Sequence, residues 1–313
     1  MRLWSLLTAF ALSLVGIGHA AQSLEVVEGD YLLEDFRFSS GELLAHVRLH
    51  YTTLGTPSHD ETGLITNAVL LLHGEGETGA GFLSQSFAGS MFGPGQPLDA
   101  QRYYVILPDN LGAGRSSKAS DELLGRFPRY TYHDMVSAQY RLVLNKLGVN
   151  HLRLIIGSAM GGAQTLLWGQ AHPYFVDTLL ALNCLPAPIA ASNDAQRLAL
   201  VEAAADERVD AVVRQQLAKT TALDLSYQLD AARTYDPKRE LEKIHAELVV
   251  VNFADDPIVS PQLGIAQEEI SRTPSGRHVL IRASEKSLGR LSIYAPDVWK
   301  VIVPSLLEVD ESR

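Results

Sequence analysis

The residue pattern with the clearest chemical meaning is Gly157-Ser158-Ala159-Met160-Gly161. It follows the apolar run Leu154–Ile156 and precedes sequence with helical periodicity. A strand–turn–helix segment of the form G-x-S-x-G presents a nucleophilic serine on a sharp turn at the end of a sheet. The central position of this segment is Ala159. Because a methyl group cannot attack a carbonyl carbon, the sequence predicts the turn without its nucleophile.

Ser158 is the neighbouring hydroxyl and the alternative nucleophile. If the motif were centred on Ser158, its flanking positions would be Ile156 and Met160, where the tight turn requires glycine. In the register of Gly157 and Gly161, the Ser158 side chain points away from the mouth of the cleft. We therefore expect Ser158 to bond to nearby backbone groups.

The elements that position this turn are short β-type runs separated by helical patterns. Several runs are continuously apolar, which is typical of parallel strands covered on both faces. The sequence thus predicts an α/β fold with a mostly parallel, doubly wound sheet and helices on both faces. The expected strands are His46–Thr53, Ala68–His73, Tyr103–Pro108, Arg153–Gly157, Thr178–Asn183, Glu247–Phe253 and His278–Arg282, and the expected helices are Met135–Leu147, Met160–Ala171 and Val298–Leu307.

One segment, at about residues 190–230, has no strand pattern. Its Ala-rich sequence predicts two helices, Ala195–Ala204 and Arg208–Lys219. They are either packing helices or a small lid over a site at the carboxyl ends of the strands, where α/β sheets bind ligands. We expect one domain over residues 22–313 that includes this segment.

The N-terminal segment, residues 1–21, has the order of a secretory signal peptide. A positive charge at Arg2 precedes an apolar run, Leu3–Gly18, and small residues follow at Ala20 and Ala21. The run is shorter than the ~20 residues of a membrane-spanning helix. Cleavage after Ala20 or Ala21 would place the protein in the periplasm or outside the cell, with no membrane attachment. The alternative is an uncleaved N-terminal anchor.

Composition excludes several other classes of protein. The 313 residues carry a net charge of −10, with no cluster of Lys and Arg, so no nucleic-acid partner is expected. The one cysteine, Cys184, excludes an internal disulfide and a cysteine-based zinc site. The histidines have no metal-ligand spacing with a carboxylate. We therefore expect neither a metal nor a cofactor.

Collinear motifs through most of the chain resemble the homoserine O-acetyltransferase branch of the α/β-hydrolase superfamily. Besides the turn around Ala159, they include Met91–Asp99, Tyr104–Asp109, Gly112–Ser117, Phe127–Tyr130, Tyr235–Pro237, Ala254–Asp256 and Ala283–Glu285. The resemblance implies an α/β-hydrolase fold and acyl chemistry, in which a serine attacks an acyl donor and passes the acyl group to an alcohol or to water.

The resemblance also assigns the family's site positions. The nucleophile position falls on Ala159 and the acid on Asp256, with Asp255 as the near alternative. The base position, usually a histidine, falls on Arg290. The oxyanion donors fall on the backbone of Glu75, in the turn after His73-Gly74, and of Met160.

Two of the three triad positions have therefore lost the required chemistry, since arginine stays protonated near neutral pH. This predicts an inactive relative that keeps a pocket for a small-molecule ligand. The alternative is an active acyl hydrolase or acyltransferase that uses displaced groups such as Ser158. Arg290 is expected either to form a bidentate hydrogen-bonded pair with Asp256 or to bind an anionic ligand. The short lid segment is expected to leave the pocket shallower or more open.

Overall fold

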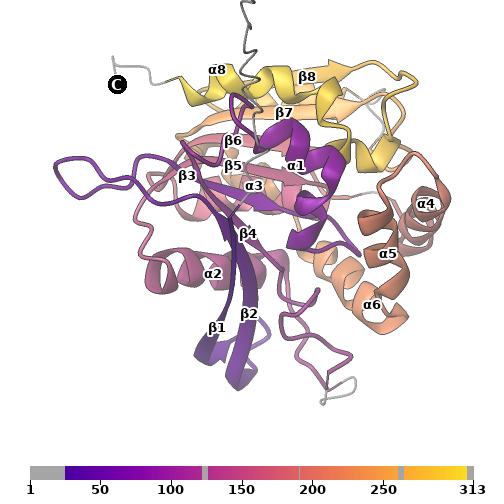
Figure 1. Ribbon diagram of the computed structural model, residues 1–313. Coiled ribbons are helices and arrows are strands. Elements are labelled where there is room, and N and C mark those ends of the chain that lie inside the picture. The colour runs from indigo at the N-terminus through magenta and orange to yellow at the C-terminus, as the bar shows by residue number, and fades with distance from the viewer. Residues whose placement is uncertain (1–24, 122–125, 190, 260–263, 309–313) are drawn as a thin grey trace, which may run out of the picture.

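The protein is described by a computed structural model over residues 25–121, 126–189, 191–259 and 264–308. The expected signal peptide, residues 1–21, lies outside these residues. Figure 1 shows one sheet of eight strands, in the order β1-β2-β4-β3-β5-β6-β7-β8. The strands β4, β3, β5, β6, β7 and β8 run parallel, and β2 pairs antiparallel with both β1 and β4. The predicted α/β class and mostly parallel sheet are confirmed.

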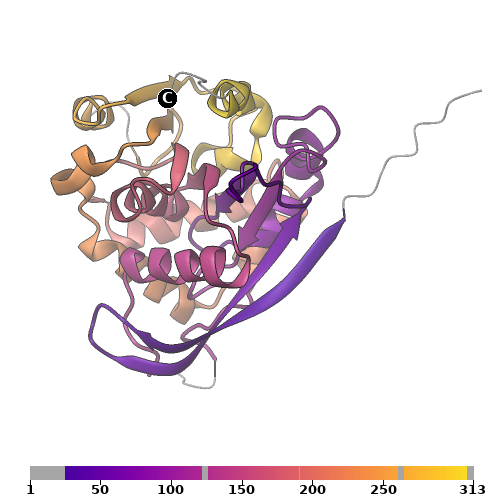
Figure 2. The same ribbon diagram turned by 90° about the vertical axis from the view of Figure 1, so that its left-hand side faces the viewer.

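The strand boundaries agree with most of the predicted runs. They are β1 Val26–Arg37, β2 Leu43–Leu54, β3 Ala68–Leu72, β4 Tyr104–Pro108, β5 Leu152–Ser158, β6 Val176–Leu182, β7 Glu247–Phe253 and β8 Gly276–Ile281. The sequence reading missed β1, whose positions are mostly exposed. With β2 it forms a long twisted hairpin that projects from the body of the molecule (Figures 1 and 2).

Successive residues of the central strands enter two separate cores. On β3, Leu70 and Leu72 pack in a core with α2 (Tyr132–Arg141) and α3 (Met160–Ala171). The alternate residues Val69 and Leu71 pack on the opposite face with α1 (Gln85–Met91) and α8 (Val303–Leu307). Because side chains alternate along a strand, a strand covered on both faces must be apolar at every position.

The predicted helices differ from the observed ones mainly at their ends. α3 has the predicted bounds, whereas α2 begins earlier, where Thr131 and Asp134 form a capping box. A π-helical turn, Leu142–Lys146, continues it. The predicted helix Val298–Leu307 is divided into 3-10 turns and α8. Two short helices, α1 and α7 (Ile265–Ile270), were not predicted.

The segment without strands contains both predicted helices, with ends that differ by up to three residues, and a third helix that was not predicted. They are α4 (Asn193–Ala205), α5 (Ala211–Lys219) and α6 (Ala222–Ala231), and they lie together at one side of the sheet (Figure 1). Thr221 at the start of α6 accepts a hydrogen bond from the Asp224 N–H and separates α6 from α5. We call α4–α6 the lid, because α5 and α6 contact the turn that follows β3, as described below.

Candidate active site

The turn between β5 and α3 has the geometry of a nucleophile elbow. Ala159 stands at its apex with φ 54° and ψ −115°, a conformation that disfavours residues with a Cβ atom. A Cβ atom on Gly157 would lie 2.1 Å from the Gly161 carbonyl oxygen, and one on Gly161 would lie 2.2 Å from the Leu72 carbonyl oxygen. These two glycines therefore let the turn pack against α3 and β3, and they fix residue 159 as its apex.

Ser158 lies below the apex, as the last residue of β5. Its side chain is buried, and its hydroxyl donates to Asn183 Oδ1 at 3.4 Å. Within the described part of the chain this is the only hydrogen bond of the Ser158 side chain, so no imidazole is positioned to activate it. The partner is a side-chain oxygen and not the backbone group that we expected.

Arg290 is buried at the base position and is held by two carboxylates. Its Nη2 donates to both carboxylate oxygens of Glu75 at 3.2 Å, and its Nη1 lies 3.7 Å from Asp256 Oδ2. The expected bidentate hydrogen bond to Asp256 is therefore not formed: Glu75 is the hydrogen-bonding partner, and Asp256 contributes a longer ion pair. Burial lowers the pKa of Arg290, but the negative charges of Glu75 and Asp256 outweigh it and raise the pKa above its usual value. Arg290 therefore stays protonated, pairs with these two carboxylates, and cannot accept a proton as a general base.

Asp256 occupies the acid position after β7. Its Oδ1 accepts from the backbone N–H groups of Ile258 and Val259, and its Oδ2 accepts from Asn183 Nδ2 at 2.8 Å. The near alternative, Asp255, points elsewhere and accepts from Ser287 Oγ at 2.6 Å. Of these two aspartates, Asp256 is therefore the one that faces Arg290.

Asn183, which the sequence reading did not single out, connects these parts. It follows β6 with φ 53°, and its side-chain amide also donates to the Gly289 carbonyl oxygen. Its backbone carbonyl accepts from Arg290 Nη1 at 3.4 Å. An asparagine tolerates positive φ, which is the one signal that could have marked it as a special position.

The turn after β3 lies directly against the elbow. A Cβ atom on Gly74 would be 3.3 Å from the Ala159 Cβ and 2.9 Å from Glu77 Oε1, so both side chains flank Gly74. Glu75 is the expected oxyanion donor on this turn. Met160, the other expected donor, begins α3, so its N–H has no partner within the helix. The Met160 N–H thus lies at the start of α3 beside the turn, and the turn carries a carboxylate on each side of Gly76.

Glu77 is a buried carboxyl whose role the sequence did not reveal. Its Oε2 accepts from the Gly74 N–H at 2.9 Å and from the Tyr294 hydroxyl at 2.8 Å. Burial, with a smaller contribution from the negative charge of Glu75, raises the pKa of Glu77 to about 7, although both hydrogen bonds and Arg290 oppose the shift. Glu77 therefore changes its charge near neutral pH.

His73 precedes this turn and is structural. Its Nδ1 donates to the Gly74 carbonyl oxygen at 2.8 Å, and its Nε2 accepts from the Asn110 N–H at 2.9 Å. Burial lowers the pKa of His73 despite the nearby negative charge of Asp109. A neutral imidazole with both nitrogens bonded has no free nitrogen to serve as a general base.

The lid covers the same turn. Gln228 on α6 accepts from the Gly76 N–H at 2.8 Å, and Thr220 donates to the Gly76 carbonyl oxygen at 2.8 Å. Ala159, Glu75 and Arg290 are at most 5% exposed. Of the two alternatives expected from a short lid, a shallower or a more open pocket, this burial contradicts the more open one.

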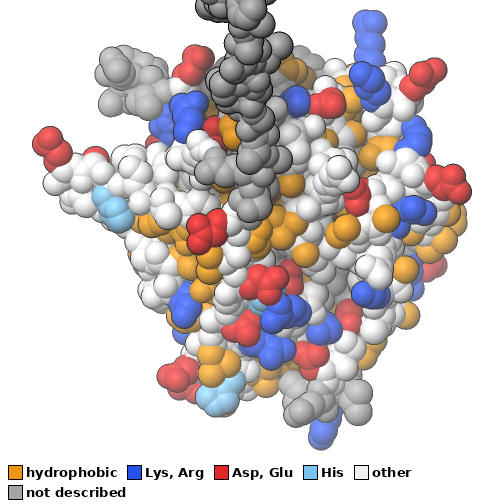
Figure 3. All heavy atoms as spheres, in the orientation of Figure 1, with side chains coloured by type: hydrophobic (Ala, Val, Ile, Leu, Met, Phe, Trp, Pro, Cys, Tyr) orange, Lys and Arg blue, Asp and Glu red, His pale blue; other side chains and the backbone are white. Residues whose placement is uncertain are grey.

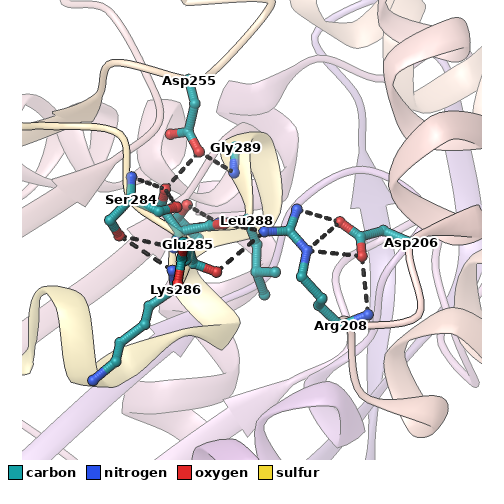
Figure 4. Close-up of polar contacts among 10 residues, drawn as sticks. Asp206, Arg208, Asp255, Ser284, Glu285, Lys286, Leu288 and Gly289 are labelled. Carbon is teal, nitrogen blue, oxygen red and sulfur yellow. Dashed lines mark hydrogen bonds and ion pairs between the residues drawn. The ribbon is translucent and has the colours of Figure 1, made fainter.

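The lid also holds the loop that carries Arg290. Arg208, which precedes α5, pairs with Asp206 at 2.6 Å and donates to the carbonyl oxygens of Glu285 and Ser287 (Figure 4). On the other side of the loop, Asp255 accepts from the Gly289 N–H. The base-position loop is therefore fixed both to the lid and to the end of β7.

The structure provides no metal centre among the residues that it describes: no three His, Cys, Asp or Glu side chains lie together in a suitable group. No helix within the described ranges is long and apolar enough to span a membrane.

The surface charge is mixed on the face shown in Figure 3. Lys and Arg side chains there are interspersed with Asp and Glu, and they form no large patch of positive or negative charge.

Comparison with known proteins agrees with this architecture. Residues 67–269 match the family model described as alpha/beta hydrolase fold. A probable acyltransferase of Methanothermobacter thermautotrophicus is 34% identical over 160 residues, which cover 50% of this chain and 48% of that protein. A homoserine O-acetyltransferase of Thermobifida fusca is 36% identical over 165 residues, which cover 48% of this chain and 42% of that protein. The chain thus matches less than half the length of these relatives.

Solved structures share the fold over nearly the whole chain. A homoserine O-acetyltransferase from Bacillus anthracis superposes with a TM-score of 0.71 at 15% identity, covering 91% of this chain and 98% of that one. The acetyl esterase MekB gives a TM-score of 0.70 at 19% identity, covering 92% and 97%. At such identities the likeness shows the fold alone. The family match and the sequence relatives together show that this chain belongs to the alpha/beta hydrolase fold family, as a member similar to the homoserine O-acetyltransferases.

Proposed function

We propose that this protein is an exported member of its family that has lost serine-dependent acyl transfer and hydrolysis and acts by binding a small molecule. The observation that carries the proposal is the pairing at the site. A methyl group stands at the elbow apex, and a charged guanidinium, bonded to Glu75 and close to Asp256, stands at the base position. Neither group can generate a nucleophile.

The burial of Arg290 supports the loss of activity independently of Ala159. An active base position needs an imidazole that can accept the proton of the nucleophile. Here Glu75, on the turn after β3, supplies a negative charge in addition to that of Asp256, and it pairs with the positive charge of Arg290. A carboxylate at this place opposes the development of an oxyanion nearby, since like charges repel at close range.

Labelling by a fluorophosphonate probe tests the loss of activity. The purified protein is expected to remain unlabelled and to leave p-nitrophenyl acetate at its background rate of hydrolysis. Labelling at Ser158 that the Ser158→Ala variant abolishes would instead establish the alternative enzyme.

Rebuilding the triad tests whether the remaining frame corresponds to a former active site. The variant must combine Ala159→Ser and Arg290→His with Glu75→Gln, because Glu75 would otherwise keep a buried charge without its partner. We expect labelling at residue 159 in this triple variant and none in the same variant with Ala159 retained. Labelling that does not depend on residue 159 would contradict the assigned register.

Export rests on the order of residues 1–21 and has its own test. Expression of the full chain in a bacterial host with a periplasm is expected to yield protein that begins at Ala21 or Gln22 in the periplasmic or secreted fraction. Intact-mass measurement distinguishes this product from an uncleaved, membrane-anchored chain.

A further inference from the structure

The lid contains an apolar groove that the former catalytic centre does not use. The groove has a volume of about 690 Å³ and lies between α4, α5 and α6, with Gly76 of the oxyanion turn on its wall. This volume falls within the range of small-molecule sites, about 300–1,000 Å³. Its apolar lining includes Leu200, Val201, Leu217, Leu223 and Leu225.

The lining residues of α4 form one stripe with a single charge at its end. Arg197, Leu200, Val201 and Ala204 recur at helical spacing and span about 10 Å along the axis. Among the residues that the structure describes, Arg197 is the only charged one that lines the groove. Val201 is 65% exposed and Leu223 38% exposed, so the apolar surface is open to a ligand from solvent.

The guanidinium of Arg197 is available to a ligand. Its carboxylate neighbour is Asp194, 3.7 Å away, and the Asp194 side chain is 94% exposed. An ion pair this long and this exposed contributes little, so a ligand carboxylate can replace Asp194 at small cost. Acidic residues are frequent elsewhere on the lid, so the positive charge of Arg197 beside the apolar stripe stands out from its surroundings.

We infer that the groove binds an amphiphile with one alkyl chain and one carboxylate head, such as a medium-chain fatty carboxylate. The chain lies along Val201, Leu217 and Leu223, and the head pairs with Arg197. The inference deepens the proposed function, since it names the site and class of the ligand that is bound without turnover. It concerns a surface separate from Ala159 and Arg290, so probe labelling and ligand binding fail or succeed independently.

Isothermal titration of the purified protein with dodecanoate, below the concentration at which micelles form, tests the inference. We expect saturable binding of one dodecanoate per chain. Val201→Asp should weaken binding at least about tenfold, because it places a charge in the apolar groove. Leu198→Asp is the matched control: Leu198 is 59% exposed on the same helix but does not line the groove, and its variant should bind dodecanoate as the original protein does.

The role of the head group is tested with Arg197→Gln. Dodecanoate should bind about fivefold more weakly to this variant, the size expected of an exposed ion pair, whereas dodecanol should bind equally to both proteins. Arg239→Gln is the control, since Arg239 has the same loose contact with a carboxylate three residues earlier, 3.8 Å from Asp236, away from the groove.

Three results would overturn the inference. The first is no dodecanoate binding, and if phosphatidylglycerol vesicles bind instead, the groove is assigned to a membrane surface. The second is an equal loss of dodecanoate binding in the Val201 and Leu198 variants. The third is that Val201→Asp converts a dimer into a monomer, which would assign the groove to a second copy of the chain.

Discussion

The elbow and the wall that faces it are held in place by different interactions. At the elbow, the backbone keeps the positive φ and the glycine contacts of a nucleophile turn although its side chain is alanine. At the facing wall, Arg290, Glu75 and Asp256 form a charged cluster that replaces the base. Close packing of main-chain atoms imposes the backbone geometry of the elbow whichever side chain residue 159 carries, whereas the side chains of the facing wall are held by the pairing of their charges.

The strained conformation of Ala159 illustrates the point. A left-handed residue with a Cβ atom costs about 1–2 kcal/mol and persists only where its surroundings determine it. The main chain around the turn is too closely packed to adopt another conformation. A Cβ atom would lie within 2.6 Å of a carbonyl oxygen at Gly157, Gly161 and Gly162. Close packing of the main chain therefore accounts for the strained conformation of Ala159.

The largest effect is expected when the packing of the elbow is broken. Gly161→Val places a side chain against the Leu72 carbonyl and should lower the free energy of unfolding by about 5 kcal/mol or more. Gly89→Ala is the control, because nothing lies within 4 Å of a Cβ atom there, and it should stabilise α1 by up to about 1 kcal/mol. Urea unfolding of both variants measures the difference, and a mild effect of Gly161→Val would show that packing does not fix the turn.

A smaller effect is expected at the facing wall. Arg290→Met leaves Glu75 and Asp256 buried without their cation and should cost about 4 kcal/mol. Adding Glu75→Gln removes one stranded charge and should recover a large part of the loss. As a surface comparison, Arg115→Met removes an exposed pair with Glu28 and should change stability by less than about 1 kcal/mol. Equal losses in the single and double variants would mean that the charges of the cluster are not coupled.

The third prediction concerns Glu77 and the pH dependence of stability. The folded pKa of about 7 lies above the ordinary 4.5, so between these values the folded protein binds a proton that the unfolded chain has released. Stability should therefore fall as pH rises from about 4.5 to 7, by up to about 3 kcal/mol by pH 8.

Glu77→Gln separates this contribution from those of other groups. The variant should be more stable than the original protein at pH 8, with the difference vanishing near pH 4.5. Its amide oxygen can still accept from Gly74 and Tyr294. Glu61→Gln, at an exposed position, should leave the pH profile unchanged. A difference that grows toward low pH would contradict the assigned direction.

Sequence patterns predicted the parts of this molecule that depend on local spacing. The apolar runs of β3 to β7 indicated strands buried on both faces, and the glycines at 157 and 161 indicated the turn and its register. The strand β1 of the hairpin was not predicted, because its side chains are mostly exposed and form no apolar run. The sequence prediction missed the third helix of the lid, α6, because Thr221 was not recognised as a helix start within the Ala-rich stretch.

Contacts between residues far apart in the chain could not be predicted in the same way. Arg290 was expected to hydrogen-bond to Asp256, yet the carboxylate that accepts its hydrogen bonds is Glu75, 215 positions away. Asn183 and Tyr294 entered the site only through the folded structure. Which carboxylate pairs with a buried cation depends on distances of a few tenths of an ångström among side chains on different loops, and no local pattern encodes these.

The sequence by itself determined that residue 159 carries a methyl group and residue 290 a guanidinium, because side-chain identity fixes which reactions are available. Only the tertiary structure decided that the guanidinium is paired with Glu75 on the turn after β3 and that α5 and α6 contact that turn. Charge pairing and burial are properties of the packed assembly of strands and loops, and they follow from how the whole chain closes around the elbow.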